Sequence, residues 1–365
     1  ASIAGYKAVM MAADKYQRFF PMLMTAAGTV KAARVVILGV GVAGLQAIAT
    51  AKRMGAVIEA SDVRPSVKEQ VESLGAKFID VPYETTEEKE AAEGVGGYAR
   101  PMPQSWLDRQ KAEVAKRVAQ ADVVITSLPG PAHVRAVMLG EGGVFASAQP
   151  GTIVIDTSTS AMDLAHELAE AATHAGIGYL EAPITNAIDA AAEGRLSIFV
   201  GGSADLYAQC MPIFEVLGNK IFHVGPHGNG ATIKLLTNLL WFVSAAAIGE
   251  GLMLGARAGV PLDTVWAAIK SSAGNSWVAE HDVPSIFAGH YDPSFSLALC
   301  CKDLRLVNEI AQAQGYTLPM GSYVQGLFEQ AKDQYGEDAA ELHVVRLLED
   351  KVGMLLRPPH GEVVR

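Results

Sequence analysis

The sequence has little cysteine, an excess of acidic over basic residues, and no apolar run of membrane-spanning length. Its three cysteines among 365 residues, Cys210, Cys300 and Cys301, form no spaced metal motif. A small and uneven number of cysteines is typical of a protein with reduced thiols, so we expect a cytoplasmic protein. Lys and Arg number 29 against 39 Asp and Glu, a net charge of -10. This charge repels phosphates and anionic lipids, so nucleic acid and membrane surfaces are not expected as partners.

The longest apolar run, Leu235 to Gly249, is shorter than the roughly 20 residues of a membrane span. Lys234 and Glu250 flank it, so we predict a buried helix instead. The N-terminus lacks the pattern of a signal peptide. The nine histidines lack metal-binding spacing, so no metal site is predicted.

Half the residues are hydrophobic, and the length is typical of about two domains. Short β-branched runs alternate with Ala-rich helical stretches over the first 227 residues, a pattern that predicts an α/β, Rossmann-like, doubly wound and mostly parallel sheet. The predicted strands are Arg34–Leu38, Ala56–Ala60, Lys77–Val81, Asp122–Thr126, Thr152–Asp156, Gly178–Glu181, Leu196–Val200 and Lys220–Val224. Residues 3–27 are predicted to be a helix and residues 82–104 a long loop.

Beyond residue 227 nearly every segment has a helical pattern, beginning with one long helix. We therefore predict a nucleotide-binding domain over residues 1–227 and an all-helical domain for substrate and oligomerisation over 228–352. Residues 353–365 are predicted to be a tail.

A glycine-rich turn follows the first of these strands. Gly39-Val40-Gly41-Val42-Ala43-Gly44 matches G-x-G-x-x-G between an apolar strand and a helix, where glycines permit close approach of a pyrophosphate to the helix N-terminus. Asp62 lies 18 residues beyond Gly44, where a carboxylate holds ribose hydroxyls. The Asp62-Val63-Arg64 segment favours NAD over NADP because a carboxylate repels a 2′-phosphate, a preference that Arg64 could soften.

Several stretches up to about Thr126 resemble the NAD-binding domain of the nicotinamide nucleotide transhydrogenase alpha subunit and, more distantly, alanine dehydrogenase. They include ARVVILGVGVAGLQAIATAKRMGAVIEASDVRP, EQVESLGAKF and GGYARPM. The resemblance implies that the glycine-rich turn and Asp62 hold NAD.

From about Asp122 to Asp350 the chain resembles the 3-hydroxyisobutyrate dehydrogenases and related β-hydroxyacid dehydrogenases, with their 6-phosphogluconate dehydrogenase-like C-terminal domain. The motifs are SLPGPAHVRAVMLGEGG, DTST, EAPITNA, LSIFVGG, GNGATIKLLTNLL and FSLALCCKDL. The sequence is therefore identified as a mosaic of two families, whether by natural fusion or by construction.

Lys234 is the candidate catalytic residue. It lies near the start of the long apolar helix, and Asn238 follows on the same face. Burial disfavours the charged form of a lysine, so we expect a pKa lowered towards the working pH, as proton transfer requires. The alternative is a lysine whose ammonium group reaches solvent from the first helical turn.

The second resemblance implies roles for these and other residues. Lys234 becomes the general acid/base on the substrate oxygen, and Asn238 orients that oxygen or helps to hold the substrate. Lys302 reaches the cofactor. The nicotinamide end of the cofactor pocket is lined by Leu128, Pro129, Ser158 and Thr159.

The chain departs from the family where substrate is selected. The usual Asp-Ala-Pro-Val-Ser-Gly-Gly is replaced by Glu181-Ala182-Pro183-Ile184-Thr185-Asn186-Ala187. Thr185, Asn186 and Ala187 are then the candidate substrate-binding residues, and the tight glycine turn of the family is not expected to persist.

The leading hypothesis is an NAD-dependent oxidoreductase acting on a small β-hydroxy acid, or on its semialdehyde. The alternatives are a reductase of a small aldehyde-acid such as tartronate or succinic semialdehyde, a non-catalytic NAD-binding module, or a transhydrogenase fragment. The apolar helix and the resemblance together predict a homodimer or homotetramer.

Overall fold

The chain divides into two units, and the division falls inside one helix. The computed structural model describes residues 22–25, 28–30, 32–40, 42–53, 55–93, 102–121, 123–186 and 195–358. The first unit spans 1–234 and the second 235–365. The division falls within α11 (Asn229–Arg257), seven residues beyond the boundary expected at residue 227.

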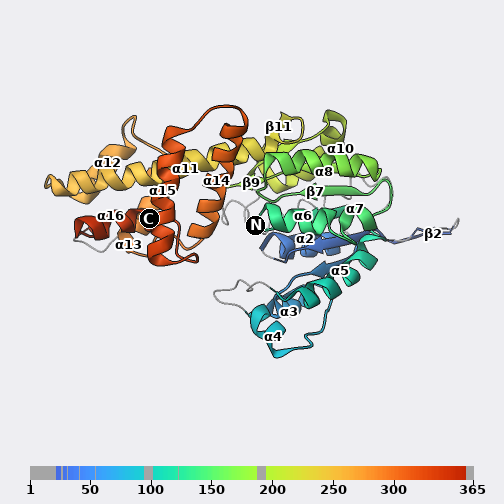
Figure 1. Cartoon of the computed structure of the whole chain (residues 1–365). Helices are drawn as coiled ribbons and strands as arrows, with labels where there is room; N and C mark the ends of the chain where they lie inside the picture. Colours follow the sequence, from blue (N-terminus) through green and yellow to red (C-terminus); the bar gives the residue numbers. More distant parts are fainter. Residues whose placement is uncertain are drawn as a thin grey trace. The chain divides into compact units, whose positions relative to one another are not determined.

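The first unit is built on a mostly parallel sheet (Figure 1). Within the described residues the strand order is β11-β10-β8-β7-β6-β3-β4-β5, and β9 pairs with β10. Neighbours are parallel except that β10 is antiparallel to β8 and β9. The strands are β3 (Arg34–Leu38), β4 (Val57–Ser61), β5 (Lys77–Phe78), β6 (Val123–Thr126), β7 (Ile153–Asp156), β8 (Gly178–Glu181), β9 (Ile184–Thr185), β10 (Leu196–Gly201) and β11 (Gly218–Gly225). The predicted α/β class is confirmed, and a strand is present at each predicted place, although β5 covers only the first two residues of the expected Lys77–Val81. Strand β9 is an additional strand that the sequence pattern does not predict.

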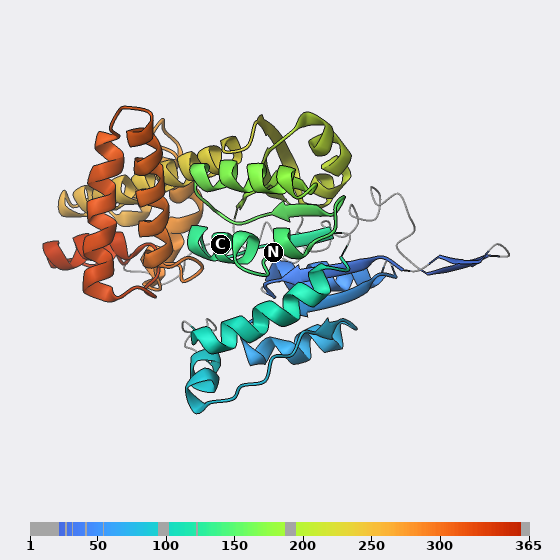
Figure 2. The same ribbon diagram turned by 45° about the vertical axis from the view of Figure 1, so that its right-hand side comes forward.

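Both faces of the sheet are covered by helices, as Figure 2 shows from a second direction. Successive residues of β3 enter different cores: Val35 and Ile37 pack on one face, and Val36 and Leu38 on the other. This alternation follows from the two-residue period of a strand. The first core includes α2 (Val42–Arg53), α3 (Lys68–Ser73), which follows the 3-10 turn η1 (Pro65–Val67), and α10 (Ala204–Leu217). The second includes α5 (Gln104–Val118), α6 (Pro131–Leu139), α7 (Val144–Ser147) and α8 (Met162–His174).

Two sequence expectations in this unit are wrong. Part of the helix expected over residues 3–27 is instead the strand β1 (Leu23–Thr25), antiparallel to β2 (Gly28–Val30); residues 1–21 lie outside the described residues. The loop expected over 82–104 contains α4 (Thr86–Glu93). Thr85 caps that helix, because its Oγ1 accepts from the Glu88 N–H (3.2 Å), and Glu88 Oε2 accepts from the N–H of Glu84 (2.8 Å), one residue before the cap.

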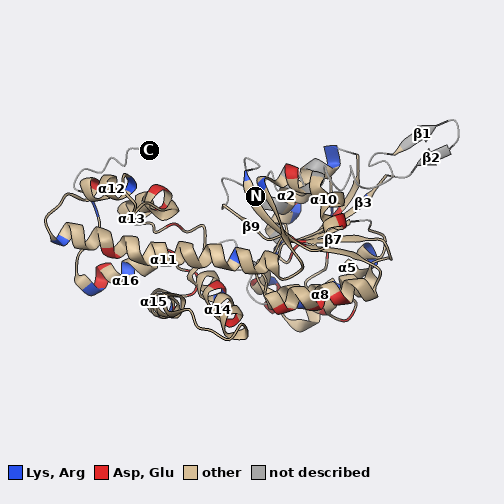
Figure 3. Cartoon of the chain, turned by 90° about the horizontal axis from the view of Figure 1, so that it is seen from above, with Lys and Arg blue, Asp and Glu red and all other residues tan. Residues whose placement is uncertain are grey.

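The second unit is helical, as predicted. Its elements after α11 are α12 (Leu262–Lys270), the π-helix η2 (Val278–Asp282), α13 (Val283–Ala288), α14 (Leu297–Ala313), α15 (Pro319–Tyr335) and α16 (His343–Val352). Figure 3 shows that α11 carries few charged residues. Phe242, Ile248 and Leu252 of α11 are buried, whereas Leu240 is 59% and Leu254 73% exposed.

Helix α11 is long and apolar enough, by length and composition alone, to cross a membrane. Its most apolar 18-residue window has a mean hydropathy of 1.6, and 33% of that window is buried. One helix of this kind is weak evidence for a membrane span, since core helices also reach such lengths and compositions.

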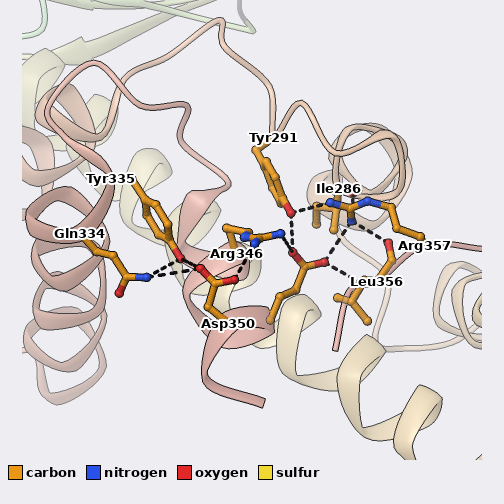
Figure 4. Close-up of polar contacts among 9 residues, drawn as sticks. Ile286, Tyr291, Gln334, Tyr335, Arg346, Asp350, Leu356 and Arg357 are labelled. Atoms are coloured by element: carbon orange, nitrogen blue, oxygen red, sulfur yellow. Dashed lines mark hydrogen bonds and ion pairs between the residues drawn. The ribbon is translucent and has the colours of Figure 1, made fainter. Parts of the chain in front are cut away.

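The described end of the predicted tail packs on the helical unit. Leu356 is fully buried, and its N–H donates to Glu349 Oε1 (2.7 Å). Arg357 donates to Glu349 Oε1 (3.0 Å) and to the Tyr291 hydroxyl (2.6 Å), which itself donates to Glu349 (Figure 4). Tyr291 has a φ of 56°, an uncommon conformation for a bulky residue, and these contacts hold it there.

A buried carboxyl group in this unit makes stability depend on pH. Burial raises the pKa of Asp282 to about 6; the hydrogen bond from Trp241 Nε1 (2.9 Å) opposes this shift, and Asp292 adds to it. Because the folded pKa lies above the unfolded one, the stabilising contribution of Asp282 is complete below about pH 4. It is lost as the pH rises through about 6.

We predict that Asp282→Asn removes this dependence. Between pH 4 and 7 the variant should gain about 3 kcal/mol of stability relative to wild type. Urea unfolding followed by tryptophan fluorescence at several pH values measures the gain. Asp263→Asn, on an exposed residue of α12, is the control; a difference between Asp282→Asn and wild type that does not change with pH would contradict the prediction.

Candidate functional site

The carboxyl ends of the parallel strands bring most of the predicted site residues of the first unit to one edge. The chain runs from β3 outwards through β4 and β5, then returns to the other side of β3 with β6. Such a reversal of strand order leaves a crevice at the carboxyl ends of the two central strands, where dinucleotides bind in this architecture. The loops after β3, β4, β6 and β7 all open onto this edge.

The glycine-rich turn after β3 has the geometry that a phosphate loop needs. Gly39 has a φ of 96° and donates its N–H to the Ser61 carbonyl (2.9 Å). A Cβ on Gly44 would lie 2.2 Å from the Gly39 carbonyl oxygen, so glycine is required for the helix to approach the turn. Helix α2 begins at Val42 and continues through Ala43; Gly41 lies outside the described residues. The turn thus fits a dinucleotide pyrophosphate at a helix N-terminus.

Asp62 holds this turn from the end of β4. Its Oδ2 accepts from the Val40 N–H (2.7 Å), and its two oxygens accept from the Arg64 backbone N–H (2.9 Å), Nε (2.9 Å) and Nη2 (2.9 Å). Burial alone would raise the pKa of Asp62, but these hydrogen bonds outweigh it, and the pKa lies below its usual value. The carboxylate is therefore ionised and already paired with Arg64. Val63, between them, accepts from the Tyr83 hydroxyl through its carbonyl (3.3 Å).

The loops after β6 and β7 are tied together. The Leu128 N–H donates to Ser158 Oγ (2.8 Å), and Asp156 Oδ1 accepts from Thr126 Oγ1 (2.8 Å) and from the Ser158 N–H (3.1 Å). Burial raises the pKa of Asp156, and those hydrogen bonds oppose the rise. The predicted cofactor residues Leu128, Pro129, Ser158 and Thr159 thus occupy two neighbouring loops.

Asn186, the first of the two positions where the family has glycine, takes a glycine-like backbone conformation. Asn186 has a φ of 84°, the left-handed conformation that glycine adopts readily and asparagine tolerates. Its Nδ2 donates to Ser197 Oγ (3.0 Å) on β10, and Thr185 pairs with Ser197 in the sheet. The Asn186 amide nitrogen is therefore held by the protein itself. Ala187 lies outside the described residues.

Lys234 lies in the second turn of α11 and is 8% exposed, so the predicted burial is confirmed. The N-terminus of α11 is capped by a residue from the end of β8: Glu181 accepts from the N–H groups of Gly228 (2.5 Å), Gly230 (2.9 Å) and Ala231 (3.3 Å). Lys234, Glu181 and the cofactor loops therefore all belong to the first unit.

A buried aspartate organises the predicted site residues of the second unit. Asn238 donates through Nδ2 to Asp303 Oδ2 (2.7 Å), and Lys302 Nζ lies 3.1 Å from Asp303 Oδ1. Asp303 is 1% and Asn238 4% exposed. Asp303, for which the sequence predicts no site role, therefore joins the predicted residues Asn238 and Lys302.

Sequence reasoning missed the roles of Asp156, Glu181 and Asp303. A signal was present, since Asp156 and Glu181 each end an apolar strand at the edge where the other site residues lie. Among the described residues, no group of three or more His, Cys, Asp or Glu side chains is arranged to hold a metal ion.

The glycine-rich turn after β3, the Asp62 carboxylate after β4 and the reversal of strand order at β3 are together typical of a pyridine-nucleotide-binding protein. Residues 8–172 match the family of the alanine dehydrogenase/PNT C-terminal domain. Residues 228–348 match the family described as NAD-binding of NADP-dependent 3-hydroxyisobutyrate dehydrogenase. The predicted mosaic of two families is confirmed.

Individual relatives support the assignment to the dehydrogenase family. The chain is 31% identical over 260 residues to 2-(hydroxymethyl)glutarate dehydrogenase of Eubacterium barkeri, an alignment that covers 65% of this chain and 86% of the relative. A structure of Mycobacterium tuberculosis 3-hydroxyisobutyrate dehydrogenase with L-serine is similar, with a TM-score of 0.70, 26% identity and coverage of 87% of this chain and 99% of that one. The chain belongs to the β-hydroxyacid dehydrogenase family that includes 3-hydroxyisobutyrate dehydrogenase.

The N-terminal relative is matched over less than half its length. Over 161 residues the chain is 48% identical to a subunit alpha polypeptide of the NAD(P) transhydrogenase of Rhodospirillum rubrum, covering 44% of this chain. The chain spans 41% of the length of that relative.

The conformation of Asn186 yields a paired test. Asn186→Gly and Asn186→Ala both lose the hydrogen bond to Ser197, but only alanine must also carry a Cβ at positive φ. We predict that the alanine variant is less stable than the glycine variant by about 1 kcal/mol. Urea unfolding measures the difference; Ser197→Ala, which removes the hydrogen bond alone, is the control. Equal stability of the two Asn186 variants would show that the left-handed turn is not maintained.

Proposed function

We propose that the chain is an NAD-dependent dehydrogenase of small β-hydroxy acids, with Lys234 as the general acid/base. The observation that carries this proposal is the position of Lys234: it is buried on a helix whose first turn is capped from the sheet edge that also bears the glycine-rich turn. A bound nicotinamide supplies the hydride acceptor. Lys234 Nζ takes the hydroxyl proton of the substrate in oxidation and returns it in reduction.

Burial of Lys234 supports this role. Burial in general disfavours the ammonium form of a lysine, and the neutral amine is the form that accepts a proton. We propose that Asn238, one helical turn later, donates a hydrogen bond to the same substrate oxygen. Asp303 orients Asn238 for this purpose by accepting from its amide nitrogen.

The substrate class rests on what the named relatives share. 2-(Hydroxymethyl)glutarate, 3-hydroxyisobutyrate and L-serine each contain a primary hydroxyl on the carbon next to the one that bears a carboxylate. We propose a substrate of this form, HOCH2–CH(R)–COO⁻, or the matching semialdehyde in the reducing direction. Thr185 is proposed to contact its carboxylate. Because Asn186 donates to Ser197, we expect it to act through the shape of the turn.

We predict that Lys234→Met lowers kcat by about 10²-fold to 10⁴-fold on the accepted substrate. The expected cause is loss of proton transfer, so the Kd for NAD should change little. NADH absorbance with a panel of HOCH2–CH(R)–COO⁻ acids identifies the substrate and measures kcat, and fluorescence titration measures the Kd.

Lys89→Met, on an exposed lysine of α4, is the matched control and should retain wild-type turnover. Tight NAD binding without turnover on any acid, or on any matching semialdehyde, would replace this proposal by a non-catalytic NAD-binding module.

We propose further that NAD is preferred to NADP. The ionised Asp62 carboxylate at the end of β4 would repel a 2′-phosphate, while the paired Arg64 guanidinium would attract it. The buried carboxylate accepts several hydrogen bonds and fixes the turn, so we infer that its charge dominates.

The preference should change in opposite directions in two variants. Asp62→Asn is expected to reduce discrimination against NADP by about tenfold, whereas Arg64→Gln should increase it. Isothermal titration of both cofactors against the three proteins measures the ratios. A wild-type Kd lower for NADP than for NAD would show that Arg64 outweighs Asp62.

A further inference from the structure

Glu181 makes an unusual cap, because it reaches the N-terminus of α11 from a distant strand. It is the last residue of β8 and is 4% exposed. Its Oε1 accepts from both the Gly228 and Gly230 N–H groups, while Oε2 has only the longer contact from Ala231 (3.3 Å). These are N–H groups at the start of a helix, which have no partner within it.

The surrounding glycines leave the carboxyl group little freedom. A Cβ on Gly201 would lie 2.1 Å from Glu181 Oε1, and a Cβ on Gly230 would lie 3.0 Å from Glu181 Cδ. Gly201 is also the residue of β10 that pairs with Glu181. The carboxyl group is therefore enclosed by β10 on one side and the first turn of α11 on the other.

The capped turn is the one that positions Lys234. Gly230 precedes Lys234 by four residues and Ala231 precedes it by three, so these residues lie one helical turn below the lysine. A cap that fixes their N–H groups fixes the start of the helix and with it the origin of the Lys234 side chain. A displacement of about 1 Å at a catalytic group is enough to slow a reaction strongly.

We propose that Glu181 is the positioning residue for Lys234, holding the first turn of α11 in the place that proton transfer requires. The inference rests on the proposed dehydrogenase function of the same site. Glu181 accepts hydrogen bonds from backbone N–H groups at the start of α11, so its effect on catalysis passes through the helix.

Several titratable groups face this carboxyl group. Asp156 of β7 is paired with Glu181 in register, and Tyr179 lies on the same strand. His227 stacks on Tyr179. His166 of α8 lies next to Gly228, because a Cβ added to that glycine would be 2.6 Å from His166 Nε2. Burial raises the pKa of Glu181 to about 7; the N–H groups of Gly230, Gly228 and Ala231 oppose this, and Asp156 adds to it.

When the Glu181 carboxyl group is protonated, we expect the proton on Oε2, because Oε2 has the longer contact and Oε1 then keeps both shorter hydrogen bonds. Glutamine keeps a carbonyl oxygen that can accept the two shorter hydrogen bonds, and it places an NH2 group, which cannot accept from Ala231, at the position of Oε2. Because the folded pKa is raised, the contribution of Glu181 to stability is complete below about pH 4.5 and is lost as the pH rises through about 7, since ionising the buried carboxyl group costs more than the N–H groups return. Glu181→Gln should retain the cap without this pH dependence.

The experiment compares Glu181→Ala, Glu181→Gln and wild type in the full chain. Asp163→Asn, which changes the first turn of α8, is the matched control. Hydrogen exchange with mass spectrometry should show the 228–231 amides opening about tenfold more readily in Glu181→Ala and close to wild type in Glu181→Gln. In wild type the protection factor should fall as the pH rises from 5 to 8, and in Glu181→Gln it should stay constant.

Two further readouts separate positioning from a merely structural cap. In Glu181→Ala, kcat should fall by about 10-fold to 100-fold with the NAD Kd unchanged, and Glu181→Gln should restore it. Acetic anhydride labelling of Lys234 at fixed pH, quantified against exposed Lys89, should differ from wild type in Glu181→Ala and not in Asp163→Asn.

The outcomes distinguish this inference from the proposed function. Faster amide exchange with unchanged Lys234 labelling and unchanged kcat would overturn the positioning role. Absence of turnover in wild type would overturn the proposed function, and the labelling result would still decide the positioning role. If Glu181→Ala does not fold, Glu181→Asp replaces it: its shorter side chain should give faster amide exchange and altered labelling, and wild-type values in both would overturn the inference.

Discussion

Parallel pairing of β3 with β4 and β6 is the constraint on which the candidate site depends. Parallel strands end at the same edge of a sheet, so residues far apart in sequence become neighbours wherever a strand stops. The glycine-rich turn follows β3, Asp62 follows β4, and Leu128 follows β6. The reversal of strand order between β3 and β6 opens space at this edge for a dinucleotide. Without this pairing these residues would not meet at one edge of the sheet.

Carboxyl groups at the strand ends hold the surrounding loops, and each is buried among donors. A buried carboxylate is costly unless its oxygens accept hydrogen bonds, and the balance differs from one strand to the next. The guanidinium of Arg64 favours the ionised form of Asp62, whose pKa is lowered. Among the described residues the donors to Glu181 are backbone N–H groups, and Asp156 lies beside it, so burial dominates and its pKa is raised. One edge thus contains a permanent anion for the cofactor loop and a neutralisable cap for the helix of Lys234.

The sheet is continuous across the junction of the two families. Strand β7 lies inside the segment that matches the alanine dehydrogenase/PNT domain, and β8 lies beyond it. Asp156 of β7 nevertheless pairs in register with Glu181 of β8. Side chains alternate between the two faces of the sheet in the strands of both families. Val154 and Tyr179 therefore pack in the core on one face, and Ile155 and Leu180 pack in the core on the other. The mosaic therefore needs no separate interface within the first unit.

The sequence by itself determined most of the strand and helix pattern, the glycine-rich turn with Asp62, and the burial of Lys234 near the start of the long helix, because periodicity and glycine requirements are local properties. It also contained the start signal of α4, Thr85 followed three residues later by Glu88, which the loop prediction for residues 82–104 overlooked. Only the tertiary structure decided that Glu181 caps α11, that Asp303 joins Asn238 to Lys302, and that Asn186 donates to Ser197. These contacts join residues distant in sequence, and burial, which sets the protonation of Glu181, is a property of the folded neighbourhood. A residue pattern specifies which groups are present, and packing decides which of them meet.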